Sequence, residues 1–493
     1  RVISVRRGSG FADAGTLLLD QSVFKREKID SLTAMNVAEA VVRVWLGSAT
    51  SVSGDGGGVI REGLVRFLAT QFIESKFGKE AGDLERMRQR TAYAAVVKRD
   101  APISQITPLD DYYYATDANK GAMVWRLLAR RTGIDAFTGV LKANMKLGGL
   151  DLAGLRGAFG QHKDLLDYSF DQVTDMDLLV GLPQAGPGET RVALRNTGSI
   201  DALVDVTAVT DKGDTLRNTL TIKAKDYGDS VFKTTARIVR VEVDTDKLYP
   251  QLDYSNDVKP SVIDESDGLL FVKKPFDRQD FAQAETNARA VLAVSPRFDD
   301  VRVLLGRALL AQGKTSEAER EFTAVLAERL PTARSIAWAN FGLGEAALKN
   351  NQPTAAISYY DRAIRSGGEI GASFAARQGR LRANASAVTD ESLKSFFAAF
   401  DKAALSSSKA ALEALMVPGE FPKAFAAGIA GQAQEWTSVI TQMDVIDAST
   451  VIVEVALKIK IINKNEESGN AVFRLTRTPE GWKLSGVESF EVR

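Results

Sequence analysis

The spacing of apolar residues changes three times along this chain, and these changes restrict the elements it can form. Residues 32–163 carry apolar side chains at helical spacing, whereas residues 175–243 alternate as strands do. Helical spacing returns over 277–385, and the final block places two helices before four strands. A length of 493 residues suggests three to five domains. We therefore predict a multidomain α+β protein with domains at 1–174, 175–264, 265–386 and 387–493.

Composition excludes several kinds of chemistry and partner. The chain has no cysteine and one histidine, so it has no disulfides, no thiol catalysis and no cysteine–metal sites. Lys+Arg and Asp+Glu both number 63, and this balance predicts no nucleic-acid partner. No apolar run reaches the 18 or so residues of a membrane helix, so we do not expect a membrane-spanning protein. The absence of thiols fits a periplasmic or secreted, extracytoplasmic location, although no signal peptide is visible.

The first helical block contains a spaced motif. Residues 39–47 read Glu-Ala-Val-Val-Arg-Val-Trp-Leu-Gly, and 18 residues separate Arg43 from Glu62. This pattern resembles the aminopeptidase N family of zinc peptidases, the gluzincins. In that family HExxH followed by x-W-x-G holds zinc on one helix face, and a glutamate 18 residues later is the third ligand. The positions of the first histidine, the general base and the second histidine carry Glu39, Ala40 and Arg43.

Two further landmarks of that family are present in altered form. The GxMEN motif, which binds the substrate's amino terminus on an edge strand, corresponds to Gly10, with Asp13 and Ala14 at the Glu and Asn positions. The Tyr-x-Lys-Gly motif, whose tyrosine stabilises the oxyanion, has Ala118 in place of the tyrosine. The resemblance covers about residues 1–260. It implies a helical catalytic lobe that lacks its amino-terminal part, followed by a small β-sandwich.

The substitution of Arg43 suggests two arrangements. Glu39 and Arg43 are an i, i+4 pair in the favourable order. If Glu62 faces them as the resemblance implies, the guanidinium would lie at the zinc position between two carboxylates, which its planar fork suits. In the alternative arrangement Glu39 and Arg43 form an ordinary surface pair. Neither arrangement leaves a ligand set for zinc, so we expect no metal and no cofactor.

Residues 277–385 have the pattern of tetratricopeptide repeats. Small and aromatic residues recur at helix crossings, as at Leu305-Gly306, Ala318 and Phe322, and again at Gly344 and Tyr360. The spacing gives two full units and a partial one. So few units are expected to need a neighbouring domain or a capping helix for burial.

The last hundred residues place two amphipathic helices, 390–404 and 408–416, before four strands. This layout resembles the nuclear-transport-factor-2-like, or cystatin-like, cone fold. Asp444 and Asp447 are expected in a turn. The resemblance implies a binding or dimerisation role.

These patterns support three functional hypotheses. The first is a non-catalytic pseudo-aminopeptidase that serves as an interaction scaffold or complex subunit, with protein partners on the repeats and the carboxy-terminal domain. The second is a peptide-binding protein that uses the old substrate cleft without cleavage. The third is a residual hydrolase that uses Glu39 and Glu62 as a carboxylate pair.

Overall fold

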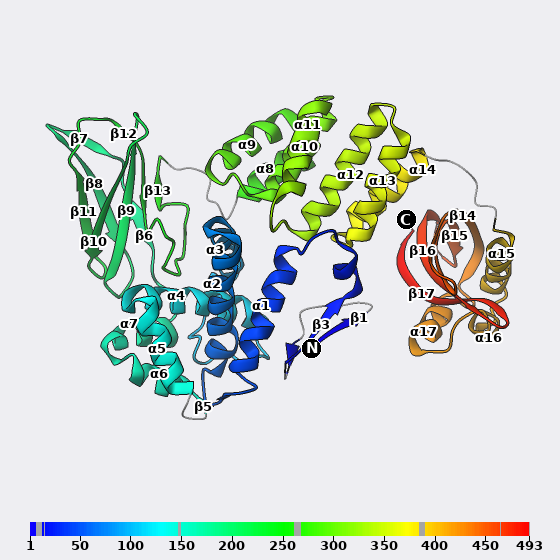
Figure 1. The fold of residues 1–493 in the computed structure, drawn as a ribbon, viewed down its shortest axis with the longest axis horizontal. Coiled ribbons are helices and arrows are strands. Elements are labelled where there is room, and N and C mark those ends of the chain that lie inside the picture. The colour runs from blue at the N-terminus through cyan, green and yellow to red at the C-terminus, as the bar shows by residue number, and fades with distance from the viewer. Residues whose placement is uncertain are drawn as a thin grey trace. The chain divides into compact units, whose positions relative to one another are not determined.

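The computed structural model describes residues 1–5, 12–13, 15–145, 149–260, 268–383, 390–463 and 465–492. It divides into two compact units. Unit 1 comprises Arg1–Ala346 and Arg362–Glu369, and unit 2 comprises Ala347–Asp361 and Ile370–Arg493. Figure 1 shows the chain in colour order, with α1 to α11 in unit 1 running from blue to green and the carboxy-terminal strands of unit 2 in orange and red.

Unit 1 begins with a small sheet in the order β1-β3-β2, followed by a helical lobe. The strands are β1 (Val2–Val5), β2 (Ala12–Asp13) and β3 (Thr16–Asp20). The helices are α1 (Ser31–Trp45), η2 (Val59–Leu64), α2 (Val65–Phe77), α3 (Lys79–Ala94), η4 (Tyr114–Lys120), α4 (Gly121–Thr132), α5 (Ile134–Met145), α6 (Leu152–Ala158) and α7 (Lys163–Asp171). Helix α1 begins where the Asp30 carboxylate accepts a hydrogen bond from the Thr33 amide, which satisfies one free helix donor. The core of this lobe is centred on Trp125, whose indole donates to the Val59 carbonyl.

Two π-helical turns, η2 and η4, cross at a pair of glycines. A Cβ added to Gly63 would lie 2.7 Å from the Asp117 carbonyl oxygen and 2.9 Å from the Gly121 Cα. No side chain fits there, because the obstacles are backbone atoms. This close crossing brings the segment that carries Glu62 against the segment that carries Ala118. Such π-turns are frequent at functional sites.

A β-sandwich follows, as the alternating pattern predicts. One sheet has the order β10-β9-β12-β13 and the other β11-β8-β6, with β7 also paired to β8. The strands are β6 (Leu178–Val180), β7 (Gln184–Gly186), β8 (Glu189–Asn196), β9 (Ala202–Thr210), β10 (Thr215–Ile222), β11 (Tyr227–Phe232), β12 (Ile238–Val243) and β13 (Val258–Lys259). The sandwich core includes Leu127 of α4 and Leu165 of α7, so the sandwich packs on the helical lobe.

Helices at repeat spacing come next. In unit 1 these are α8 (Gly268–Asp277), α9 (Phe281–Val294), α10 (Asp299–Ala311) and α11 (Thr315–Ala327). The boundary between the units falls within α12 (Ala333–Lys349) and again within α13 (Pro353–Ser366). Phe322 is fully buried, and its ring occupies the space that a Cβ on Gly306 or Gly342 would need. The small and aromatic positions that the repeat pattern identifies are therefore core positions.

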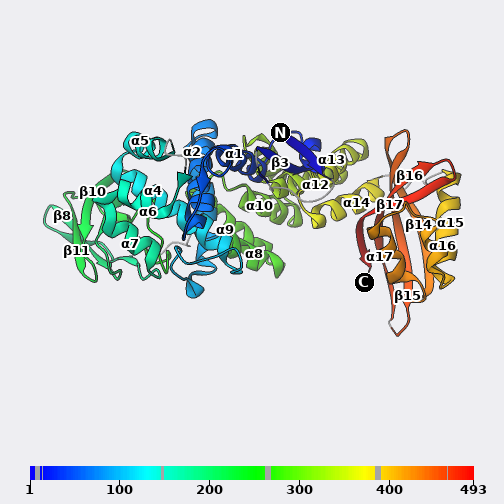
Figure 2. The same cartoon turned by 90° about the horizontal axis from the view of Figure 1, so that it is seen from below.

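Unit 2 continues with α14 (Ile370–Ala383), α15 (Glu391–Leu405), α16 (Lys409–Glu413) and α17 (Glu420–Ile429). An antiparallel sheet of four consecutive strands ends the chain: β14 (Ala433–Asp447), β15 (Thr450–Ile461), β16 (Glu466–Thr478) and β17 (Gly481–Val492). Helix α15 packs on this sheet around Phe397, Phe400 and Phe473 (Figure 2).

The sequence pattern did not predict α17, and its assignment of Asp444 to a turn is wrong, because Asp444 lies inside β14. Asp447 is the last residue of β14, and its carboxylate accepts hydrogen bonds from the amide and hydroxyl of Ser449 in the turn that follows. Asp444 accepts hydrogen bonds from Arg380 of α14, which also donates to Glu454 of β15 at 2.5 Å. A buried guanidinium needs such acceptors, and Asp444 supplies them from within the sheet rather than from a turn.

Among the described residues, no helix is both long enough and apolar enough to cross a membrane.

Candidate functional site

Arg43 and Glu62 form an ion pair between α1 and η2. The Arg43 Nη2 lies 2.6 Å from the Glu62 Oε2, and its Nη1 donates to the Arg61 carbonyl oxygen at 2.9 Å. The two side chains are 26% and 12% exposed, so most of the pair is shielded from water. Burial alone would lower the pKa of Arg43, but the hydrogen bond and charge of Glu62, with the charge of Glu39, raise it. The guanidinium therefore stays charged beside Glu62.

Glu39 is not the second acid of the expected group, in which the Arg43 guanidinium would lie between Glu39 and Glu62. Its Oε1 accepts a hydrogen bond from Arg66 Nε at 2.8 Å, and Arg66 Nη1 donates to Asn119 Oδ1 at 2.9 Å. Arg66 lies one turn beyond Glu62, on α2. The site therefore contains two neighbouring arginine–glutamate pairs rather than one arginine between two carboxylates. Ala40, at the general-base position, lies on the same helix and carries no titratable group.

Asp117 is the most unusual titratable group near this pair. Its side chain is fully buried on η4, and neither carboxyl oxygen has a hydrogen-bond partner. Burial, followed by the charge of Glu62, raises the pKa of Asp117 to about 8, although the cation of Arg61 opposes the shift. Its Oδ2 lies where a Cβ on Gly58 would be, so only glycine fits opposite it. At neutral pH Asp117 is mostly a neutral acid.

The segment around Ala118, which the resemblance matched to an oxyanion motif, makes structural contacts. Ala118 is buried, and its neighbour Lys120 donates to Asp100 Oδ2 at 2.7 Å with both side chains almost wholly inside the protein. Asp100 also accepts from Tyr93 at 3.0 Å and from the Thr174 amide at 2.8 Å. The lysine of this motif therefore holds η4 to α3 and to the chain that enters the sandwich.

The substrate-binding landmark is described only in part. Asp13 lies in β2, at one edge of the small sheet, while Gly10 and Ala14 lie outside the described residues. Three apolar side chains of α1 are exposed close to this sheet: Val41 at 49%, Val44 at 38% and Trp45 at 54%. Residues at this spacing share one face of a helix. Helix α1 contacts β2 and β3, and a Cβ added to Gly15, between these strands, would lie 3.8 Å from the Val44 side chain.

Glu39, Arg43 and Glu62, which the resemblance matched to zinc-ligand positions, do not fit zinc. Zinc requires three or four converging nitrogen, sulfur or carboxylate ligands. Glu62 is occupied by Arg43 and Glu39 by Arg66, and a guanidinium would lie beside the metal. Across the part of the chain that the structure describes, no group of three His, Cys, Asp or Glu residues could hold a metal ion.

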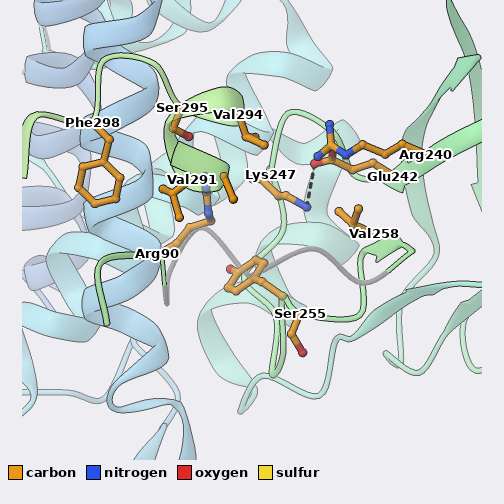
Figure 3. A pocket seen from close by; sticks show the side chains of 13 residues that line it. Arg90, Arg240, Glu242, Lys247, Ser255, Val258, Val291, Val294, Ser295 and Phe298 are labelled. Carbon is orange, nitrogen blue, oxygen red and sulfur yellow. Dashed lines mark hydrogen bonds and ion pairs between the residues drawn. The ribbon is translucent and has the colours of Figure 1, made fainter. Parts of the chain in front are cut away.

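A separate pocket of about 60 Å³ lies among α3, the sandwich and α9 (Figure 3). Val291, Val294 and Phe298 form its apolar side. Its charged side is already paired, because Glu242 accepts from Arg240 at 2.7 Å and lies 3.2 Å from the Lys247 Nζ. This pocket is therefore a junction between the parts of unit 1.

Sequence reasoning missed Arg66 and Asp117. Arg66 follows Glu62 by four residues. This i, i+4 spacing could have indicated that Arg66 lies on the same helix face as Glu62. The isolation of Asp117 had no signal in the sequence, because it depends on how η4 packs against Gly58.

Comparison with known proteins identifies one region. The tetratricopeptide repeat family matches residues 276–334, 303–370 and 341–412. No curated protein matches the chain. The helical array of residues 276–412 thus carries tetratricopeptide repeats. The last match extends beyond the boundary at 386 that the sequence pattern suggested, through α15 and into α16. Such repeats indicate a protein-interaction role.

Proposed function

We propose that this protein is a non-catalytic, aminopeptidase-like scaffold that binds protein partners through its repeats and its carboxy-terminal domain. The ion pair of Arg43 with Glu62 is the observation that carries the proposal. At 2.6 Å it uses the one carboxylate that the zinc-peptidase resemblance retains, and it places a permanent cation where a metal would need a ligand.

The hydrolase alternative requires a carboxylate that can accept a proton from water. Glu62 and Glu39 are each neutralised by an arginine, at 2.6 and 2.8 Å. A carboxylate oxygen that already accepts an arginine donor is not free to orient a water for attack. Asp117 cannot replace them, because its fully buried side chain cannot reach a substrate.

Peptide binding without cleavage is the second candidate. The exposed Val41, Val44 and Trp45 beside β2 favour it, because an edge strand next to an apolar surface can accept an extended segment. In this reading the segment would add to the sheet through main-chain hydrogen bonds.

Turnover of an aminoacyl chromogenic substrate, with and without added zinc, tests the proposal. We expect no turnover above that of the Glu62→Ala variant. Zinc-dependent turnover that Glu62→Ala abolishes would overturn it. Binding of unstructured peptides that Trp45→Ala weakens, again without turnover, would favour the second candidate.

A further inference from the structure

Three side chains of the repeat array form a ladder at equal spacing. Phe276 of α8, Arg307 of α10 and Trp338 of α12 follow one another at intervals of 31 residues. The Arg307 guanidinium carbon lies 3.7 Å from the centroid of the Trp338 ring and 4.8 Å from that of Phe276. Both distances are within the range of cation–π attraction, so the two rings fix the plane of the guanidinium.

Arg307 has no polar partner in the part of the chain that the structure describes. Within the described residues it makes no hydrogen bond or ion pair, although its guanidinium has five donors. The two acids whose charges act on Arg307 already have other partners. Asp277 pairs with Lys273, and Glu369 accepts from the Trp338 indole and lies 3.7 Å from Arg334.

The local charges therefore leave one cation uncompensated. Burial lowers the pKa of Arg307 to about 10, with opposing contributions from Glu369 and Arg334, so it is still charged at neutral pH. An unpaired, half-buried arginine is costly unless an anion joins it. The neighbouring ion pairs, Lys273–Asp277 and Arg334–Glu369, are internally neutral.

We propose that Arg307 receives a carboxylate from an acidic segment of a partner protein. The planar fork can donate two parallel hydrogen bonds to one carboxylate, and the rings hold it in place before binding. Phe341 packs edge-on against Trp338, with ring centroids 5.5 Å apart, and supports that ring. A single uncompensated cation matches one carboxylate, whereas phosphorylated or nucleic-acid partners need several cations. This inference rests on the protein-interaction role of the repeats.

Two labelled peptide pools of equal length provide the test, by fluorescence anisotropy on the full chain. One pool has Asp or Glu fixed at two central positions, the other has Asn or Gln there, and the remaining positions are randomised. We expect the acidic pool to bind at least about tenfold more tightly, since charge-assisted pairs are the stronger ones. Arg307→Lys, which keeps the charge but loses the fork, should weaken that binding about tenfold. Arg289→Lys is the matched control, because Arg289 is already paired with Glu285 and Glu317 on α9 and α11.

Protection of the wild-type chain gives a readout that does not depend on the variant's folding. Phenylglyoxal modifies accessible guanidinium groups, and the acidic pool should slow modification of Arg307, measured by peptide mass spectrometry. Equal binding of the two pools, including no binding of either, would overturn the inference, as would equal losses in Arg307→Lys and Arg289→Lys. Tighter binding of a phosphoserine pool than of the acidic pool would also overturn it. None of these outcomes affects the zinc and turnover tests of the proposed function.

Discussion

The isolated carboxyl of Asp117 predicts an unusual dependence of stability on pH. Its pKa of about 8 in the folded protein exceeds the ordinary value of 3.8. Between these values the folded state holds a proton that the unfolded state has released, so the free energy of unfolding falls as the pH rises. Each pKa unit corresponds to about 1.4 kcal/mol, and the loss between pH 5 and pH 8 is about 3–4 kcal/mol as an upper value.

The variant Asp117→Asn keeps the shape of the side chain and removes this titration. The free energy of unfolding of the variant minus that of the wild type should therefore increase by about 3 kcal/mol from pH 5 to pH 8. Urea unfolding at several pH values, followed by tryptophan fluorescence, measures the difference and cancels the other titrating groups.

Asp171→Asn is the matched control for this experiment. Arg156 donates to Asp171 at 2.5 and 2.6 Å and holds the pKa of that carboxyl below its ordinary value. Asp171 is therefore ionised in both states throughout the pH 5–8 window, and its difference from wild type should be constant there. A constant difference for Asp117→Asn as well would refute the reasoning, because it would mean that the carboxyl ionises normally in the folded protein.

Three further substitutions test the packing of unit 1 by chemical unfolding. Lys120→Met should destabilise by about 3–5 kcal/mol, since it leaves the carboxylate of Asp100 buried without its cation, and adding Asp100→Asn should recover part of the loss. Gly342→Ala should cost about 1–3 kcal/mol because its Cβ would meet the Phe322 ring at 2.2 Å, and Phe322→Leu should relieve part of that cost. Gly63→Ala meets backbone atoms instead, so no single side-chain substitution should rescue it. Two results would contradict the packing described: full recovery of the stability of Gly63→Ala when a neighbouring side chain is truncated, or an unfolding midpoint of Lys120→Met equal to that of the wild type.

Elements with a strong period were predictable from the sequence. The alternation predicted over residues 175–243 corresponds to strands β6 to β12, which end at Val243, because alternating apolar spacing alone specifies such strands. The π-turns η2 and η4 were not predictable, since they arise where two glycines let two helices approach. Helix α17 lacks a polar N-cap, as Gly419 precedes it, which removes the usual signal of a helix start.

The candidate site was predictable to the same limited extent. The zinc-peptidase resemblance implied that Glu62 faces Arg43, and the Arg43 Nη2 lies 2.6 Å from the Glu62 Oε2. The sequence favoured Glu39 as the second acid on Arg43, because the i, i+4 relation is local and visible. In the structure Arg66, 27 residues away, competes for Glu39 and binds it. A tertiary competitor of this kind leaves no mark in local spacing.

Zinc content after equilibration with zinc and dialysis, measured by mass spectrometry, tests the central claim most directly. The claim is that Arg43 stands at a ligand position facing Glu62 in a lobe that otherwise keeps the zinc-peptidase arrangement. We predict no stoichiometric zinc in the wild type. The double variant Glu39→His/Arg43→His should bind about one equivalent, because two histidines then join Glu62 as ligands. Adding Glu62→Ala to the double variant should abolish this binding. One equivalent in the wild type, or none in the double variant, would contradict the claim.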